Sequence, residues 1–193
     1  MTTALHAAAV ANDAAAVRAL LASGARIEAR DKARRTALLA AARANAIAAA
    51  RALIEAGADV NAKDNIRDTP FLYAGAEGRT EILNLCLAHG ANLGDTNRYG
   101  GNALIPACHH GHPEAVAALL RTAIDINHVN RLGWTALLET VILSDGGETH
   151  QNILGQLLAA GADPDIADKH GVTVLQHARQ RGYATMAAML ARV

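Results

Sequence analysis

Aromatic residues are scarce in this chain of 193 residues: they make up 3% of it, as one Phe, three Tyr and one Trp. A core built on ring packing is therefore excluded. The apolar residues, 51% of the chain, must supply the core instead, and most of them are Ala and Leu. Both are strong helix formers. The composition predicts an all-α chain whose core is assembled from small aliphatic side chains.

Net charge and long apolar runs are also missing. The 18 basic residues are balanced by 18 acidic ones, so no basic excess exists to neutralise phosphates and nucleic-acid binding is disfavoured. No run of 18 apolar residues occurs, which excludes a membrane-spanning helix. The first residues show no charged segment followed by an apolar one, so we expect a cytoplasmic protein, or a periplasmic one if a leader was trimmed.

Cysteine is rare as well. Cys86 and Cys108 are the two present, and they fall in different predicted helices. Two such residues form no disulfide framework, which fits a reducing compartment.

What the chain does contain is a period. Thr recurs at positions 3, 36, 69, 135 and 173, Asn102 fills the vacant place, and the steps are 33, 33, 33, 33 and 38 residues. A fixed period in this range is typical of a repeat array. It predicts six units, starting at about 3, 36, 69, 102, 135 and 173. Each has a helix capped by the periodic residue, a polar turn and a second helix.

Glycine and acidic residues keep phase with this period. Gly follows the second helix in four units, where a left-handed residue commonly ends a helix. A loop comes next, with Asp or Asn at its start and a turn after it. The glycines after the helices are Gly24, Gly57, Gly90 and Gly161, and the loop residues are Asp31, Asp64, Asn97, Asn130 and Asp168.

Residues 3–8 (TALHAA) and 69–74 (TPFLYA) look like variants of the ankyrin signature T-P-L-H-x-A. With the phased glycines and turns, the chain resembles an ankyrin-repeat protein over essentially its whole length. Residues 102–107, 127–139 and 145–147 resemble, more narrowly, small stand-alone bacterial ankyrin-repeat proteins. The resemblance implies an all-α ankyrin-repeat solenoid of six helix pairs with short β-hairpin tips. It also implies one domain over residues 1–193, with the first and last units as caps, and we expect a monomer.

Two units depart from the pattern. The fourth has Ala123 where the others have Gly, so either Ala123 adopts a positive φ or that helix ends differently. The fifth is five residues longer, with the extra residues between 142 and 152. Asp145 followed by Glu148 predicts a capping-box start for its second helix. The insertion is either a tolerated surface loop or a functional one.

The resemblance implies a non-enzymatic scaffold that binds another protein with its hairpin tips and the groove side of its first helices. Tyr, Trp and Arg, which often anchor interfaces, gather at these positions in units three to five. The candidate partner-binding residues are Tyr73, Arg98, Tyr99, Arg131, Leu132, Trp134, Glu139, His109 and His110. A structural role for Trp134, packed on the neighbouring hairpin, stands beside the binding role.

The alternative is a small-molecule or metal-binding module centred on units three to five and the 142–152 insertion. Residues 108–112 (CHHGH) carry several potential ligands, but His109 and His110 diverge on a helix and a closed zinc site needs four ligands. An enzyme is the third class. No nucleophile–base set or phosphate-binding glycine loop supports it, and we assign no catalytic residue, metal or cofactor.

Overall fold

The computed structural model describes residues 3–192, and in that range the chain forms twelve helices and no strand. The described residues fall into two compact units, each treated by itself below. The first unit is Met1–Gly75 with Arg79–Arg98, and the second is Ala76–Gly78 with Tyr99–Val193. The all-α prediction is confirmed. The tips are hairpins closed by turn hydrogen bonds rather than by strand pairing.

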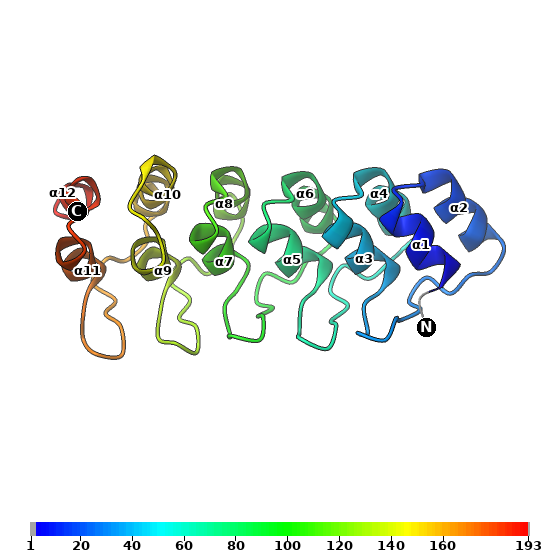
Figure 1. Ribbon diagram of the computed structural model, residues 1–193, viewed down its shortest axis with the longest axis horizontal. Helices are drawn as coiled ribbons and strands as arrows, with labels where there is room; N and C mark the ends of the chain where they lie inside the picture. Colours follow the sequence, from blue (N-terminus) through cyan, green and yellow to red (C-terminus); the bar gives the residue numbers. More distant parts are fainter. Residues whose placement is uncertain (1–2, 193) are drawn as a thin grey trace. The chain divides into compact units, whose positions relative to one another are not determined.

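Helices come in pairs, one pair for each of the six sequence repeats (Figure 1). The first compact unit holds α1 (Ala4–Val10), α2 (Ala14–Ala22), α3 (Ala37–Ala44), α4 (Ile47–Glu55), all but the last residue of α5 (Pro70–Ala76), and α6 (Thr80–Ala88). The second holds α7 (Leu104–His109), α8 (Pro113–Leu120), α9 (Ala136–Ile142), α10 (Glu148–Ala159), α11 (Val174–Gln180) and α12 (Ala184–Leu190).

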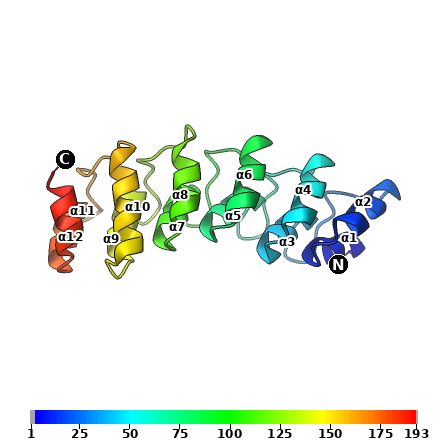
Figure 2. The ribbon, with the colours of Figure 1, turned by 90° about the horizontal axis from the view of Figure 1, so that it is seen from above.

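Within each unit the helices form two layers, because first helices contact first helices and second helices contact second helices. In the first unit α1 packs on α3, α2 on α4 and α4 on α6; in the second α7 packs on α9, α9 on α11, α8 on α10 and α10 on α12. Figure 2 shows the pairs of each unit from above. The core between the layers is Leu-rich and holds one aromatic, Phe71, which is fully buried.

The periodic Thr residues begin the first helices as the sequence predicts. In α1, α3, α5, α9 and α11 the Thr hydroxyl accepts a hydrogen bond from the backbone N–H three residues later. Asn102 does the same work for α7, because its Oδ1 accepts from the N–H groups of Leu104 and Ile105 at 3.2 and 3.4 Å.

Four of the six second helices end at a left-handed glycine, and α8 in the middle of the second unit does not. Gly24, Gly57, Gly90 and Gly161 have φ between 83° and 90°. Ala123 has no positive φ, so of the two possibilities left open by the sequence, the helix ends differently. In its place Thr122 donates its hydroxyl to Leu119 O at 2.6 Å and accepts from Ile124 N at 3.2 Å. The side chain thereby ends the helix without left-handed strain.

The five tips share one turn. In four of them the Asp or Asn at the start accepts two backbone N–H bonds through Oδ1, as Asp31 does from Ala33 and Arg35 at 2.8 and 2.9 Å. Three residues after that start, every tip has a left-handed residue: Arg34, Arg67, Gly100, Gly133 and Gly171. A residue with a Cβ costs roughly 1 kcal/mol more there than glycine does.

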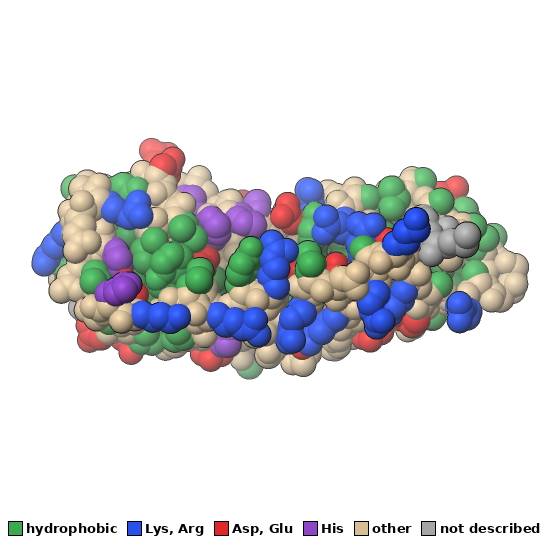
Figure 3. Space-filling view, turned by 60° about the horizontal axis from the view of Figure 1, so that its bottom comes forward, with side chains coloured by type: hydrophobic (Ala, Val, Ile, Leu, Met, Phe, Trp, Pro, Cys, Tyr) green, Lys and Arg blue, Asp and Glu red, His purple; other side chains and the backbone are tan. Residues whose placement is uncertain are grey.

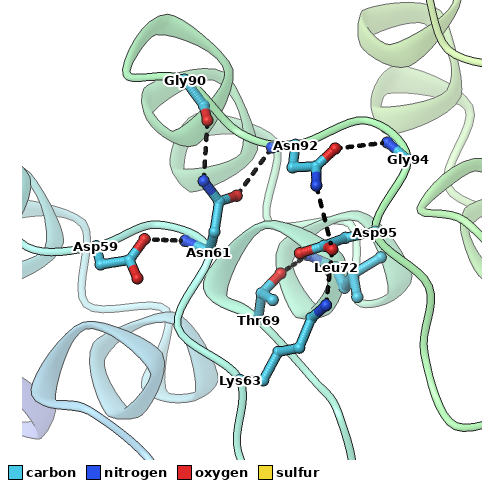
Figure 4. A network of polar contacts seen from close by, with 9 residues as sticks. All are labelled: Asp59, Asn61, Lys63, Thr69, Leu72, Gly90, Asn92, Gly94 and Asp95. Atoms are coloured by element: carbon cyan, nitrogen blue, oxygen red, sulfur yellow. Dashed lines mark hydrogen bonds and ion pairs between the residues drawn. The ribbon is translucent and has the colours of Figure 1, made fainter.

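Side chains also link neighbouring repeats of the first unit, as Figure 4 shows. Asn61 donates from Nδ2 to Gly90 O at 3.0 Å and accepts from Asn92 N at 2.8 Å. Lys63 Nζ lies 2.7 Å from Asp95 Oδ1. These bonds join loops one repeat apart and fix the register of the stack within this unit.

The 142–152 insertion forms a loop and lengthens the following helix. The expected capping box at Asp145 is wrong: the N-cap of α10 is Gly147, with no side-chain hydrogen bond, and the helix runs twelve residues from Glu148. Asp145 Oδ1 instead accepts from Gly147 N at 2.9 Å. Tyr183 ties the loop to α12, because its hydroxyl donates to Ser144 O at 2.7 Å.

Among residues 3–192, none of the helices combines the length and the apolar character that a membrane span needs.

Candidate functional site

The second unit carries exposed apolar side chains on two consecutive tips. Tyr99 is 51% exposed and Leu132 is 47% exposed. The two tips are joined by their backbones, because Arg131 N donates to Tyr99 O at 2.9 Å. Large apolar groups are therefore presented to solvent on a hydrogen-bonded framework rather than on loose loops.

Long basic side chains pack against the left-handed glycines of these tips. A Cβ added at Gly100 would lie 2.8 Å from Cγ of Arg131, and one added at Gly133 would lie 2.5 Å from Cγ of Lys169. Lys169 also donates from Nζ to Arg131 O at 2.6 Å. Each tip thus leaves room, through its glycine, for a long basic side chain from the next tip.

Trp134 is half-buried and follows Leu132 in the same tip. Its backbone belongs to the turn, since its N–H donates to Asn130 Oδ1 at 3.1 Å and its carbonyl accepts from Asn130 N at 3.0 Å. A half-buried ring fits both roles that the sequence leaves open, packing and partner contact.

Glu139 lies on the first helix of the same repeat and is only 6% exposed. Asn130 Nδ2 donates to its Oε1 at 2.8 Å. Burial raises the pKa of Glu139 to about 7, and the bond from Asn130 only partly opposes this. His109 Nδ1 lies 3.8 Å from Glu139 Oε2. Burial lowers the pKa of His109, and the neighbouring His110 and His150 add to the effect, so neither partner of this pair is fully charged near neutral pH.

The corresponding pair in the last repeat holds a carboxyl group whose pKa is lowered instead of raised. Asp168 and His177 stand in register with Asn130 and Glu139, and His177 Nε2 lies 2.9 Å from Asp168 Oδ2. The N–H bond from Val172 lowers the pKa of Asp168 to about 2, burial opposes the shift, and His177 adds to it. The first residue of a tip and the helix residue nine places later therefore meet in both repeats.

Histidines gather near the insertion (Figure 3). His110 Nδ1 lies 2.6 Å from Ala76 O, and His150 Nε2 lies 3.1 Å from His109 O. Backbone carbonyls thus occupy one nitrogen of each ring. No group of three or more His, Cys, Asp or Glu in residues 3–192 is arranged to hold a metal ion. Burial raises the pKa of the Cys108 thiol above its usual value, and a buried thiol is a poor nucleophile.

A cavity of about 570 Å³ lies beside these histidines. The insertion loop and the first turn of α10 form most of its wall. Its lining residues are His110, Gly111, Leu143, Ser144, Asp145, Gly147, Glu148, Thr149 and His150. The lining offers carboxylates, hydroxyls and imidazoles, so any ligand it accepts would be polar.

Two of the nine candidate partner-binding residues, Tyr73 and Arg98, belong to the first unit. Arg43 Cζ stands 4.6 Å from the centroid of the Tyr73 ring, a distance at which a cation is attracted to an aromatic face. That face of Tyr73 is therefore already covered. The other seven candidates lie in the second unit.

Sequence reasoning missed the hydrogen-bond partners of Glu139 and His109. From the sequence, Asn130 is interpreted as a turn residue and His150 as a loop residue, yet the first hydrogen-bonds Glu139 and the second the carbonyl of His109. The signal that could have revealed the Asn130–Glu139 pair is the nine-residue spacing that it shares with Asp168 and His177, an acidic residue and a histidine that can pair.

Comparison with known proteins gives a consistent result. The family profile described as "Ankyrin repeats (3 copies)" matches residues 1–64 and 65–130. The ankyrin repeat protein YahD of Escherichia coli (strain K12) is 46% identical over 54 residues, which cover 28% of this chain and 27% of that protein. The matched segment thus spans about a quarter of the curated relative.

Solved structures match over nearly the full length. An ankyrin repeat domain from Acinetobacter baumannii is 54% identical, with a TM-score of 0.94 over 97% of this chain and 96% of that one. A second ankyrin repeat protein is 42% identical, with a TM-score of 0.94 over 100% and 98%. The ankyrin repeat domain of Bcl-3, of the IkappaB protein family, is 26% identical, with a TM-score of 0.88 over 98% and 85%.

The ankyrin-repeat fold is a non-catalytic interaction scaffold, and such repeats generally mediate contacts between proteins. The phased caps, the shared turn and the two helix layers all agree with these matches, two of which come from bacteria. This chain belongs to the ankyrin-repeat family.

Proposed function

We propose that this chain is a non-enzymatic scaffold that binds another protein, with its main anchors on the tips of the second unit. The observation that carries the proposal is the pair of exposed side chains Tyr99 and Leu132 on consecutive tips joined by a backbone hydrogen bond. Apolar groups held on an ordered framework lose little freedom on binding, which favours affinity. Arg131, exposed beside them, supplies polar complement.

The first helices of the second unit would add contacts behind the tips. His109, His110 and Glu139 form a polar wall there, and half-buried Trp134 contributes ring surface. Tyr73 and Arg98 would contribute separately, from the first unit. Residues 1–193 would act as one repeat domain and as a monomer. One cooperative unfolding transition and a monomeric mass in solution would support that part.

The test is a pull-down from the lysate of the source organism with two double variants. Tyr99→Ser with Leu132→Ser removes the anchors. Val10→Ser with Leu143→Ser removes two other exposed apolar side chains, 54% and 40% exposed. We expect the first pair to lose the partner of the unsubstituted protein and the second to retain it. Retention by both, with both folded by circular dichroism, contradicts the assignment of the anchors.

The second candidate function is binding of a small polar molecule, and the cavity of about 570 Å³ at the insertion favours it. Thr149 is exposed at the rim, so Thr149→Trp would fill the cavity without disturbing the core. The measurement is a thermal-shift screen with polar metabolites and divalent metals. A ligand that raises the melting temperature of the unsubstituted protein but not of Thr149→Trp would support this function over the first.

A further inference from the structure

The tips of the first unit carry arginine where those of the second carry glycine. Arg34 and Arg67 stand at the left-handed position of the turn, with φ of 62° and 70°. Asn and Gly are the residues that adopt this conformation with least strain. A strained backbone position is a reason to look for a function of the side chain held there.

Three basic side chains of these tips, Lys32, Arg34 and Arg67, point to solvent. These side chains make no hydrogen bond or ion pair with other residues in the range 3–192. In Figure 3 the blue side chains of Lys and Arg gather over this part of the surface, in the right-hand half of the view.

The neighbouring acidic groups do not neutralise them. Asp31 accepts two N–H bonds of its own turn and pairs with Arg35 at 2.7 Å. Burial tends to raise the pKa of Asp31, but the bonds from Arg35 and Ala33 outweigh it and lower the pKa. Asp64 Oδ1 is likewise turned to the N–H groups of its own tip. The carboxylates serve the turns, and the cations remain available.

Two cross-links hold the tips together. Asn65 N donates to Ala33 O at 3.0 Å, and Arg30 Nη1 donates to Lys63 O at 2.5 Å. Arg34 and Arg67 therefore stand on one framework, one repeat apart, with the 39% exposed Ile66 next to Arg67.

We propose that these two tips form a second docking surface, for an acidic segment of a partner protein. Guanidinium groups bind carboxylates through two parallel hydrogen bonds, and Ile66 would contact an apolar side chain between the acidic ones. A protein fits better than a nucleic acid because no aromatic residue on these tips offers a stacking surface for bases.

This surface is independent of the Tyr99 and Leu132 anchors, so either can fail alone. The probe is a fluorescein-labelled deca-glutamate peptide, measured by fluorescence anisotropy at low and at physiological ionic strength. The test variant is Arg34→Gly with Arg67→Gly, which removes two charges and relieves both strained positions, so that loss of folding is not expected. The matched control is Arg18→Gln with Arg51→Gln, exposed on α2 and α4 of the same unit.

We expect the unsubstituted protein and the control to bind the peptide alike, more weakly as salt rises, and the test variant to bind about tenfold more weakly. Equal loss in both variants would overturn the proposal, because it would show a response to net charge alone. Failure of the unsubstituted protein to bind the peptide would also overturn it, as would tighter binding of an oligothymidylate of matched charge.

Discussion

The tips of the two units share a turn but place their long basic side chain in opposite ways. In the first unit Arg34 occupies the left-handed position, and the residue of the next tip that corresponds to Lys169 is the short Asn65. In the second unit the left-handed position is Gly133, and the long Lys169 of the next tip lies across it. Arg34 is exposed to solvent, whereas Lys169 donates to the carbonyl of Arg131 on the neighbouring tip. The basic side chain faces outward in the first case and links two tips in the second.

The largest effect is expected from placing the first unit's residue in the second. Gly133→Arg should lower the free energy of unfolding by about 3 kcal/mol, because left-handed strain adds to the displacement of Lys169. Urea denaturation measures it. Gly171→Arg is the matched control, since φ is 74° there and no atom lies within 4 Å of the added Cβ. Equal losses in both variants would show that strain alone matters.

Glu139 offers a second contrast, because the first unit has Ala40 and Tyr73 at the corresponding positions. The folded-state pKa of about 7 is above the ordinary 4.5. Ionisation therefore opposes folding, and stability falls as pH rises from about 4.5 to about 7. Glu139→Gln should raise the free energy of unfolding by about 2 kcal/mol near pH 8 and hardly at all near pH 4.5.

Thermal melts across this pH range check the Glu139 prediction. Glu148→Gln, at an exposed position of α10, controls for the loss of one negative charge. A pH-independent gain for Glu139→Gln would mean that the carboxyl ionises normally.

Relief of the strained arginine gives a smaller effect. Arg34→Gly should raise the free energy of unfolding by about 1 kcal/mol, since glycine tolerates the left-handed turn. Arg35→Gly, one residue along, should lower it, because Arg35 has no positive φ and loses its ion pair with Asp31. Calorimetric melting temperatures of the two variants must move in opposite directions if the turn geometry is as described.

The end of α8 gives the smallest effect. Thr122→Val should lower the free energy of unfolding by about 1 kcal/mol, because two hydrogen bonds of the hydroxyl are lost. Ala123→Gly should bring no gain, since Ala123 is not left-handed. A rise in melting temperature for Ala123→Gly would show that α8 ends at a glycine-like cap after all, as α4 of the first unit does.

The local rules of the fold could be predicted from the sequence. Thr at a helix start and Gly at a helix end act on groups within about four residues, and the period repeats these signals until they are unambiguous. The end of α8 could not be predicted. The period compares Ala123 with the glycines of other repeats, but the side chain of Thr122 ends the helix one residue earlier.

The candidate site was harder to predict because its geometry depends on contacts between repeats. The residue types of Tyr99 and Leu132 suggested an interface, but the hydrogen bond that joins their tips is made by backbone atoms. The pairing of Asn130 with Glu139 depends on how a tip folds back on its helix. Asp145 misled for the opposite reason: a capping-box pattern is present, but Gly146 and Gly147 carry the chain two residues further before α10 begins.

The two cysteines have a practical consequence. Cys86 in α6 and Cys108 in α7 are completely buried, one in each unit. Burial raises the pKa of Cys86 to about 12 and that of Cys108 further still, so neither thiol reacts until its surroundings open. Alkylation followed by mass spectrometry would time the opening of each half of the chain separately. Each unit thus contains a native thiol whose alkylation rate reports local opening, with no label or substitution added.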